Sequence, residues 1–152
     1  MSSTRIAAVL AASALVGAGC GGSSPSTSGS LTRAELIAKA DVICARVHVE
    51  YHANGYTTKA SIARLAPILA GDEQTAVDEL RGLRAPASMV SDWNMIIDNA
   101  QTTATDTAKL GQLAKEGKFD QAAPLFNANQ QNEHRALAVA ARDGFKECAT
   151  AS

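Results

Sequence analysis

A heptad pattern between about residues 88 and 116 constrains the fold more than any other feature of this chain. Apolar and small residues recur there at alternating spacings of four and three: Met89, Trp93, Ile96, Ala100, Thr103, Thr107, Leu110 and Ala114. A helix places such residues along one seam, which is the packing surface of an antiparallel bundle. The small residues in the middle of the seam are expected to let a neighbouring helix approach closely. Gly117 is expected to end the helix.

A first helical region precedes this seam. It is predicted to begin at Thr32, because Thr32-Arg33-Ala34-Glu35 has the form of a capping box, in which the first and last residues satisfy each other's backbone N–H groups. Asn54-Gly55 is expected to end the region, because both residues tolerate the left-handed backbone of a helix stop. From Leu31 onward, no stretch alternates between apolar and polar residues as a strand would.

Proline and glycine interrupt the second and last helical regions. The second covers about 58–83, where Pro67 is expected to kink it and Gly71 to split it into two short helices. The last runs from about residue 120 to residue 143 or beyond, with Pro124 in its first turn, where a missing N–H group is tolerated. These regions predict an all-α fold, an up-and-down four-helix bundle with a kinked or split second helix, closed by one disulfide.

The N-terminal residues have the pattern of an export signal. Met1–Arg5 carries one positive charge, and Ile6–Val16 is an uncharged apolar run that is too short to cross a membrane. The small residues that follow end in Ala18-Gly19-Cys20, which resembles the lipobox of bacterial lipoproteins. That resemblance implies cleavage before Cys20 and attachment of a diacylglycerol to its thiol. A plain signal peptide that is cut elsewhere is the alternative.

Three segments follow from this interpretation. Residues 1–19 are the signal peptide, residues 20–30 are the lipidated cysteine with a flexible linker rich in glycine and serine, and residues 31–152 are the helical domain. Two acyl chains of the palmitate kind give durable anchoring. The predicted location is therefore the extracytoplasmic face of the cell membrane.

Three cysteines are an odd number for an exported protein. If Cys20 carries lipid, Cys44 and Cys148 remain in an oxidising compartment, which favours a disulfide between them over two buried free thiols. The first and last helices of an antiparallel bundle could present both sulfur atoms from their contact faces.

Several segments resemble a group of small actinobacterial exported lipoproteins. The segment Leu36–Cys44 is similar to the group's opening, K-A-x-x-I-C preceded by an apolar residue, and Leu83–Pro86 to its central L-x-x-P joint. The segment Ala141–Cys148 is similar to its closing A-x-x-G-F-x-x-C. The resemblance implies a helical bundle closed by a disulfide, and it implies no activity.

The three histidines are weak candidates for a metal site. His48 and His52 lie four residues apart, on one side of a helix, and His134 belongs to the predicted neighbouring helix. The segment between His48 and His52 differs from the metalloprotease motif, because its glutamate is one position too late. The preferred interpretation is histidines at the core boundary and on the surface, with no metal and no cofactor.

A few other side chains are candidates for a site. Gln130 and Glu133 fall near the apolar stripe of the last helix, which favours either a polar cavity inside the bundle or, as the preferred interpretation, a solvated side of that helix. Trp93 and Tyr51 are expected in the core rather than in a binding site. No recognisable nucleophile and base are present, so we expect no enzyme.

Charge narrows the classes of partner. The chain has 14 basic and 15 acidic residues, which leaves no basic surface for nucleic acid. The sequence therefore predicts a membrane-anchored binding or structural module of the cell envelope, whose partner is an envelope protein, a polymer or a small ligand. The alternative is a metal or small-ligand carrier that uses the bundle interior.

Overall fold

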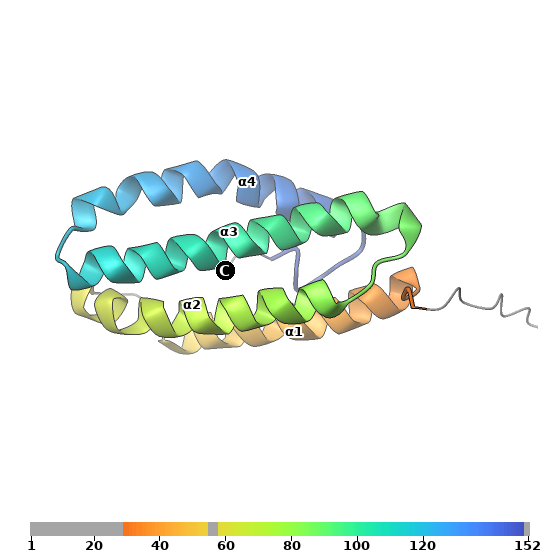
Figure 1. Cartoon of the computed structure of the whole chain (residues 1–152), viewed down its shortest axis with the longest axis horizontal. Coiled ribbons are helices and arrows are strands. Elements are labelled where there is room, and N and C mark those ends of the chain that lie inside the picture. Colours follow the sequence, from red (N-terminus) through yellow and green to blue (C-terminus); the bar gives the residue numbers. More distant parts are fainter. Residues whose placement is uncertain (1–28, 55–57, 151–152) are drawn as a thin grey trace, which may run out of the picture.

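The computed structural model describes residues 29–54 and 58–150, and within these ranges the fold is all-helical with no strand (Figure 1). Neighbouring helices run in opposite directions along the molecule. Two short 3-10 helices, η1 and η2, lie in the joints on either side of α3. In chain order the elements are α1 (Arg33–Asn54), α2 (Lys59–Gly82), η1 (Ala87–Met89), α3 (Val90–Lys115), η2 (Phe119–Gln121) and α4 (Ala123–Arg142).

The pair α2 and α3 forms the most extensive helix interface. The two outer helices, α1 and α4, each pack on a different helix of this pair. The first helix, α1, packs against α2, and α4 packs against α3. The segment 143–150, which we name the C-terminal tail, leaves the end of α4 and reaches α1 (Figure 1). The tail therefore connects the two helices that the packing leaves apart.

The buried apolar side chains form two clusters, one towards each end of the molecule. The larger cluster takes residues from all four helices and the tail, including Leu36, Ala40, Val77, Leu80, Trp93, Ile97, Ala140 and Phe145. The smaller cluster gathers around Leu110 and Leu113, with Ala66 and Ala122. Trp93 is buried and stacks on Phe145 with 5.7 Å between ring centroids, so the prediction that it belongs to the core is confirmed. The side chain of Tyr51 lies outside the described residues.

Local signals in the sequence account for the start of α1 and the end of α3. The Thr32 backbone N–H donates to the Glu35 carboxylate at 2.9 Å and the Glu35 N–H donates to the Thr32 hydroxyl at 3.3 Å, which confirms the predicted capping box. Gly117 has a φ of 73° after the last turn of α3, and the N–H of Lys118 donates to the carbonyl of Leu113. This is the bonding pattern of a Schellman motif, in which the left-handed backbone favours glycine.

The predicted split of the second helix is wrong. Helix α2 is continuous over Lys59–Gly82, with Pro67 inside it and Gly71 in an exposed position where a Cβ would meet no other atom. Pro67 lies against Gly111 of α3, where an added Cβ would approach the proline ring to 3.0 Å. Close packing against α3 therefore holds the helix through a proline that would otherwise interrupt it.

The last helix ends before the cysteine that was expected to lie on it. Gly144, with a φ of 85°, ends α4 in a second Schellman motif, in which the N–H of Phe145 donates to the carbonyl of Ala140 at 3.0 Å. Cys148 therefore lies in the tail, not on a helix face. It forms the predicted disulfide with Cys44 of α1, with 5.2 Å between the Cα atoms, and the alternative of two free thiols is wrong.

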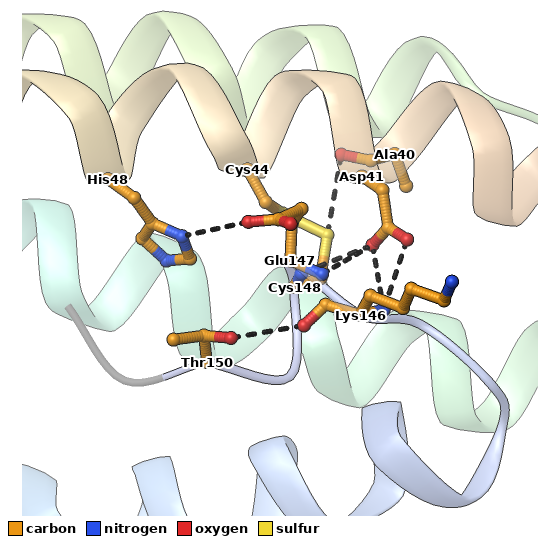
Figure 2. The surroundings of a disulfide bond; sticks show 8 residues. All are labelled: Ala40, Asp41, Cys44, His48, Lys146, Glu147, Cys148 and Thr150. Atoms are coloured by element: carbon orange, nitrogen blue, oxygen red, sulfur yellow. Dashed lines mark hydrogen bonds and ion pairs between the residues drawn. A yellow bond between two sulfur atoms is a disulfide. The ribbon is translucent and has the colours of Figure 1, made fainter.

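A carboxylate of α1 holds the tail beside the disulfide (Figure 2). Asp41 accepts hydrogen bonds from the consecutive backbone N–H groups of Lys146, Glu147 and Cys148, at 3.0–3.2 Å. Hydrogen bonds to an ionised acceptor are among the stronger ones in proteins. The Cys148 sulfur also lies 3.4 Å from the Ala40 carbonyl oxygen, a contact without a hydrogen bond, since a disulfide sulfur carries no hydrogen.

Three of the sequence predictions fall on the N-terminal segment. The signal peptide (1–19), the lipidated Cys20 and the linker up to residue 28 lie outside the described residues. Within 29–54 and 58–150, no helix has both the length and the apolar character that crossing a membrane requires.

The variant Cys148→Ser tests the contribution of the disulfide. The bridge spans 104 positions, and closing a loop of that size contributes up to about 4.7 kcal/mol in the chain-entropy model. We expect a clear fall in the melting temperature, which is measured by circular dichroism. A reductant should lower the melting temperature of the unchanged protein to that of the double variant Cys44→Ser/Cys148→Ser, and should leave the double variant unaffected. An unchanged melting temperature in Cys148→Ser would contradict this role.

Candidate functional site

A cavity of about 300 Å³ lies between the two core clusters. All four helices and the C-terminal tail contribute to its lining. Much of the wall is apolar, with Val47, Ala76, Val77, Leu80, Ile96, Leu110, Leu125 and Leu137. The volume corresponds to about ten water molecules at about 30 Å³ each, and it falls at the small end of the range for ligand pockets.

Small side chains in the α3 seam leave the space for this cavity. Ala100, Thr103 and Thr107 all line it, in the middle of the heptad pattern. These are the residues that were expected to let a neighbouring helix approach closely, and in the structure they border the cavity. A close approach of α3 to α2 is seen at Gly111, against Pro67.

Glu73 of α2 is the most unusual group in the cavity lining. Its side chain is buried, with a relative exposure of 5%, and neither carboxylate oxygen has a hydrogen-bond partner among the side chains and backbone that the structure describes. Burial raises the pKa of Glu73 from 4.5 to about 7. The nearby Thr107 hydroxyl favours the ionised form and so opposes the rise in pKa, although it is not placed well enough to count as a hydrogen-bond partner. The negative charge of Asp72 raises the pKa of Glu73 further.

Two more carboxyl groups border the same cavity. Asp106 comes from α3 and Glu133 from α4, and partial burial raises the pKa of Asp106. The side-chain oxygen of Asn99 is also buried without a partner. The lining contains no lysine and no arginine among the described residues, so the fixed charges that face the cavity are acidic.

Glu133 is half-buried and lines the cavity. The preferred interpretation placed Gln130 and Glu133 on a solvated side of the last helix, and the alternative placed them in a polar cavity. The side chain of Gln130 lies outside the described residues. Glu133 fits both interpretations, because it borders the cavity and keeps part of its surface exposed.

Glu73 is not among the site residues predicted from the sequence, although its spacing indicates a buried position. Leu69, Glu73, Ala76 and Leu80 follow one another at spacings of four, three and four, which places the glutamate on the buried stripe of α2. The predicted helix stop at Gly71 interrupted this stripe just before Glu73. A continuous helix would have placed a carboxyl group among buried leucines.

The histidines are not gathered into a metal site. His48 lines the cavity, and its Nδ1 lies 3.7 Å from a carboxylate oxygen of Glu147 in the tail (Figure 2). His134 is exposed on α4, and the side chain of His52 lies outside the described residues. Among the side chains that the structure describes, no three histidine, cysteine or acidic residues are grouped to hold a metal ion. Glu73, Asp106 and Glu133 therefore border one cavity without forming a shared ligand set.

No family model, curated protein or solved structure matches this chain. The cavity is the feature of the described residues that could bind a ligand. Its apolar walls suit a small organic molecule, and its buried carboxyl group would orient one. The disulfide cysteines, Cys44 and Cys148, form part of the wall and join two of its sides.

The variant Glu73→Gln tests the burial of this carboxyl group. A pKa that is raised in the folded protein means that the folded state holds its proton more tightly, so stability is full below about pH 4.5 and falls as the pH rises towards 7. Between pH 5 and pH 8 we expect the unchanged protein to lose about 2 to 3 kcal/mol of unfolding free energy relative to the variant. Urea unfolding at both pH values measures the difference.

The control for this experiment is Glu79→Gln, an exposed residue of the same helix that pairs with Arg46. It should shift stability by less than about 1 kcal/mol, because exposed ion pairs contribute little. If Glu73→Gln and Glu79→Gln show the same dependence on pH, Glu73 does not titrate as a buried group.

Proposed function

We propose that this protein is a lipid-anchored, non-enzymatic protein of the cell envelope whose helical domain binds a small, largely apolar ligand in its interior. The observation that carries the ligand-binding proposal is the cavity with a buried carboxyl group whose oxygens have no hydrogen-bond partner among the described residues. A buried polar group without a partner is destabilising, by about 1 to 3 kcal/mol or more for a charged group. A bound ligand that supplies the missing partner would offset this.

The proposed anchor is argued from the N-terminal sequence. Its support is the single positive charge of Met1–Arg5, the short apolar run Ile6–Val16 and the small residues before Cys20. The disulfide between the other two cysteines fits an oxidising compartment outside the cytoplasm. It also leaves Cys20 as the one cysteine that does not take part in the bridge. Membership of the actinobacterial lipoprotein group is proposed on the same residues and on the motifs around Cys44 and Cys148.

We propose that the helical domain is an up-and-down four-helix bundle. Its support is the succession of antiparallel neighbours, in which α1 packs on α2, α2 on α3 and α3 on α4. In this arrangement the C-terminal tail takes the place of a direct interface between α1 and α4. The bundle interior at that side would then be the ligand cavity.

The variant Cys20→Ala tests the anchor. We expect it to move the protein from the membrane fraction to the soluble fraction after cell disruption, because the thiol that would carry the lipid is absent. Immunoblots of the two fractions measure the distribution. Cys148→Ser serves as the control and should remain in the membrane fraction. Retention of Cys20→Ala in the membrane would contradict the anchor.

A neutral naphthalene alcohol tests the cavity as a binding site. The full chain is placed in phosphatidylcholine nanodiscs, and 1-naphthalenemethanol is titrated in a calorimeter, with empty discs as the blank. We expect saturable binding with one site per chain. The variant Ala100→Leu should weaken binding at least tenfold, because its larger side chain would occupy the cavity that Ala100 lines.

The matched control is Ala108→Leu, which adds the same side chain at an exposed position of α3 outside the cavity lining. It should bind the alcohol as the unchanged protein does. Equal binding by both leucine variants would place the alcohol outside the cavity and contradict the proposed function.

A further inference from the structure

We propose that the cavity selects a small apolar molecule that carries a protonated amine, and that the ammonium group pairs with the carboxylate of Glu73. This inference rests on the proposed function and names the chemical class of its ligand. Three features of the described residues support it. They are the hydrogen-bonding capacity left unfilled in the cavity, the sign of the charges around it and the apolar character of its walls.

The cavity has unfilled acceptors. Within the described chain, the buried side-chain atoms of the lining that have no partner are Oε1 and Oε2 of Glu73 and Oδ1 of Asn99. When Glu73 is ionised, all three atoms accept hydrogen bonds and none of them donates. An ammonium group brings three N–H donors and no acceptor, so it supplies what these atoms lack. The two oxygens of Glu73 have almost no accessible surface, so the side chain has to turn towards the cavity to meet the ammonium group.

The carboxyl groups that α3 and α4 contribute to the cavity lining have the same sign of charge as Glu73. Asp106 faces the cavity from α3 and Glu133 from α4, and Asp72 adds negative charge from the same helix as Glu73. From α1 the cavity receives His48, which faces the carboxylate of Glu147 in the tail at 3.7 Å. A cation would be attracted by this surface, and an anionic ligand would be repelled.

Pairing of opposite charges would give an amine a higher affinity than a neutral ligand of the same shape. Water is largely excluded around Glu73, and an interaction between opposite charges is much stronger there than at an exposed site. An alcohol could donate one hydrogen bond to the carboxyl group and would leave its charge without a partner. Glu73 therefore favours the amine over the alcohol, provided that the carboxyl group is ionised.

The cavity walls determine the size and the apolar character of the part of the ligand that does not contact Glu73. Val47 of α1, Val77 and Leu80 of α2, and Ile96 and Leu110 of α3 surround the acidic groups with apolar surface. A cavity of about 300 Å³ excludes a long polyamine and a peptide, and it accommodates a single ring system or a short branched chain. The ligand class is thus a compact apolar body with one ammonium group.

Three naphthalene ligands that differ in one group test the selectivity. The full chain in phosphatidylcholine nanodiscs is titrated at pH 7.5 with 1-naphthylmethylamine, 1-naphthalenemethanol and 1-naphthoic acid. We expect the amine to bind at least tenfold more tightly than the alcohol, and the acid to bind most weakly. In Glu73→Gln, which keeps the shape of the side chain, the affinity of the amine should fall to that of the alcohol measured in the same variant.

The control variant is Glu79→Gln, which removes an exposed charge from the same helix and should leave all three affinities as they are. At pH 5.5 the advantage of the amine should shrink, because Glu73 is then protonated in the empty cavity. Other acidic groups and one histidine also lie near the cavity and could add to this change: Asp72, Asp106, Glu133, Glu147 and His48. Only the part of the change that Glu73→Gln abolishes is assigned to Glu73.

The outcomes separate the two proposals. Equal binding of the amine and the alcohol, tighter binding of the acid, or an amine preference that survives in Glu73→Gln would overturn the pairing with Glu73 and leave the cavity as a binding site. Failure of all three ligands to bind the unchanged protein would overturn the proposed function itself.

Discussion

The covalent bond between Cys44 and Cys148 joins two sides of the molecule that helix packing leaves apart. Helix α1 packs on α2 and α4 packs on α3, so the tail that follows α4 is the link between the outer helices. Asp41 strengthens that link by accepting hydrogen bonds from three consecutive N–H groups of the tail. This link adds to the direct packing of α1 on α2, and the two cysteines form part of the cavity wall.

The cavity follows from how the chain distributes small and large side chains. Large apolar residues gather in two clusters, and alanine and threonine occupy the middle of the α3 seam between them. Close packing is maintained at Gly111 against Pro67, near the smaller cluster. Glu73 borders the cavity, and burial removes water from its carboxyl group without giving either oxygen a hydrogen-bond partner among the described residues. A group of this kind reduces the stability of the empty protein, which is typical of sites that serve a ligand.

The helices and the disulfide could largely be predicted from the sequence, because their signals are local. The capping box at Thr32, the stop at Gly117 and the seam from Met89 to Ala114 need only neighbouring residues to act. The disulfide followed from the number of cysteines and the expected compartment. Helix α2 was wrongly split, because the contact that holds it through Pro67 comes from Gly111 on another helix, and no local pattern reports that contact.

The candidate site was much less predictable. Glu133 was expected on a solvated side of its helix, and it lines the cavity. Glu73 was not predicted as a site residue, because the helix was expected to stop at Gly71. A cavity arises where four helices fail to fill the space between them, so it depends on side chains that are distant in the sequence. The role of Asp41 was missed for the same reason, because its three partners lie more than 100 positions away.

The central claim is that Glu73 is a buried carboxyl group whose missing partner is a cation. The most direct measurement is a carbon-detected NMR titration of the Glu73 side chain, with and without 1-naphthylmethylamine. A pKa of about 7 in the empty protein, lowered when the amine is added, is the predicted result. A pKa near the ordinary 4.5 in the empty protein, or one that the amine leaves unchanged, would contradict the account.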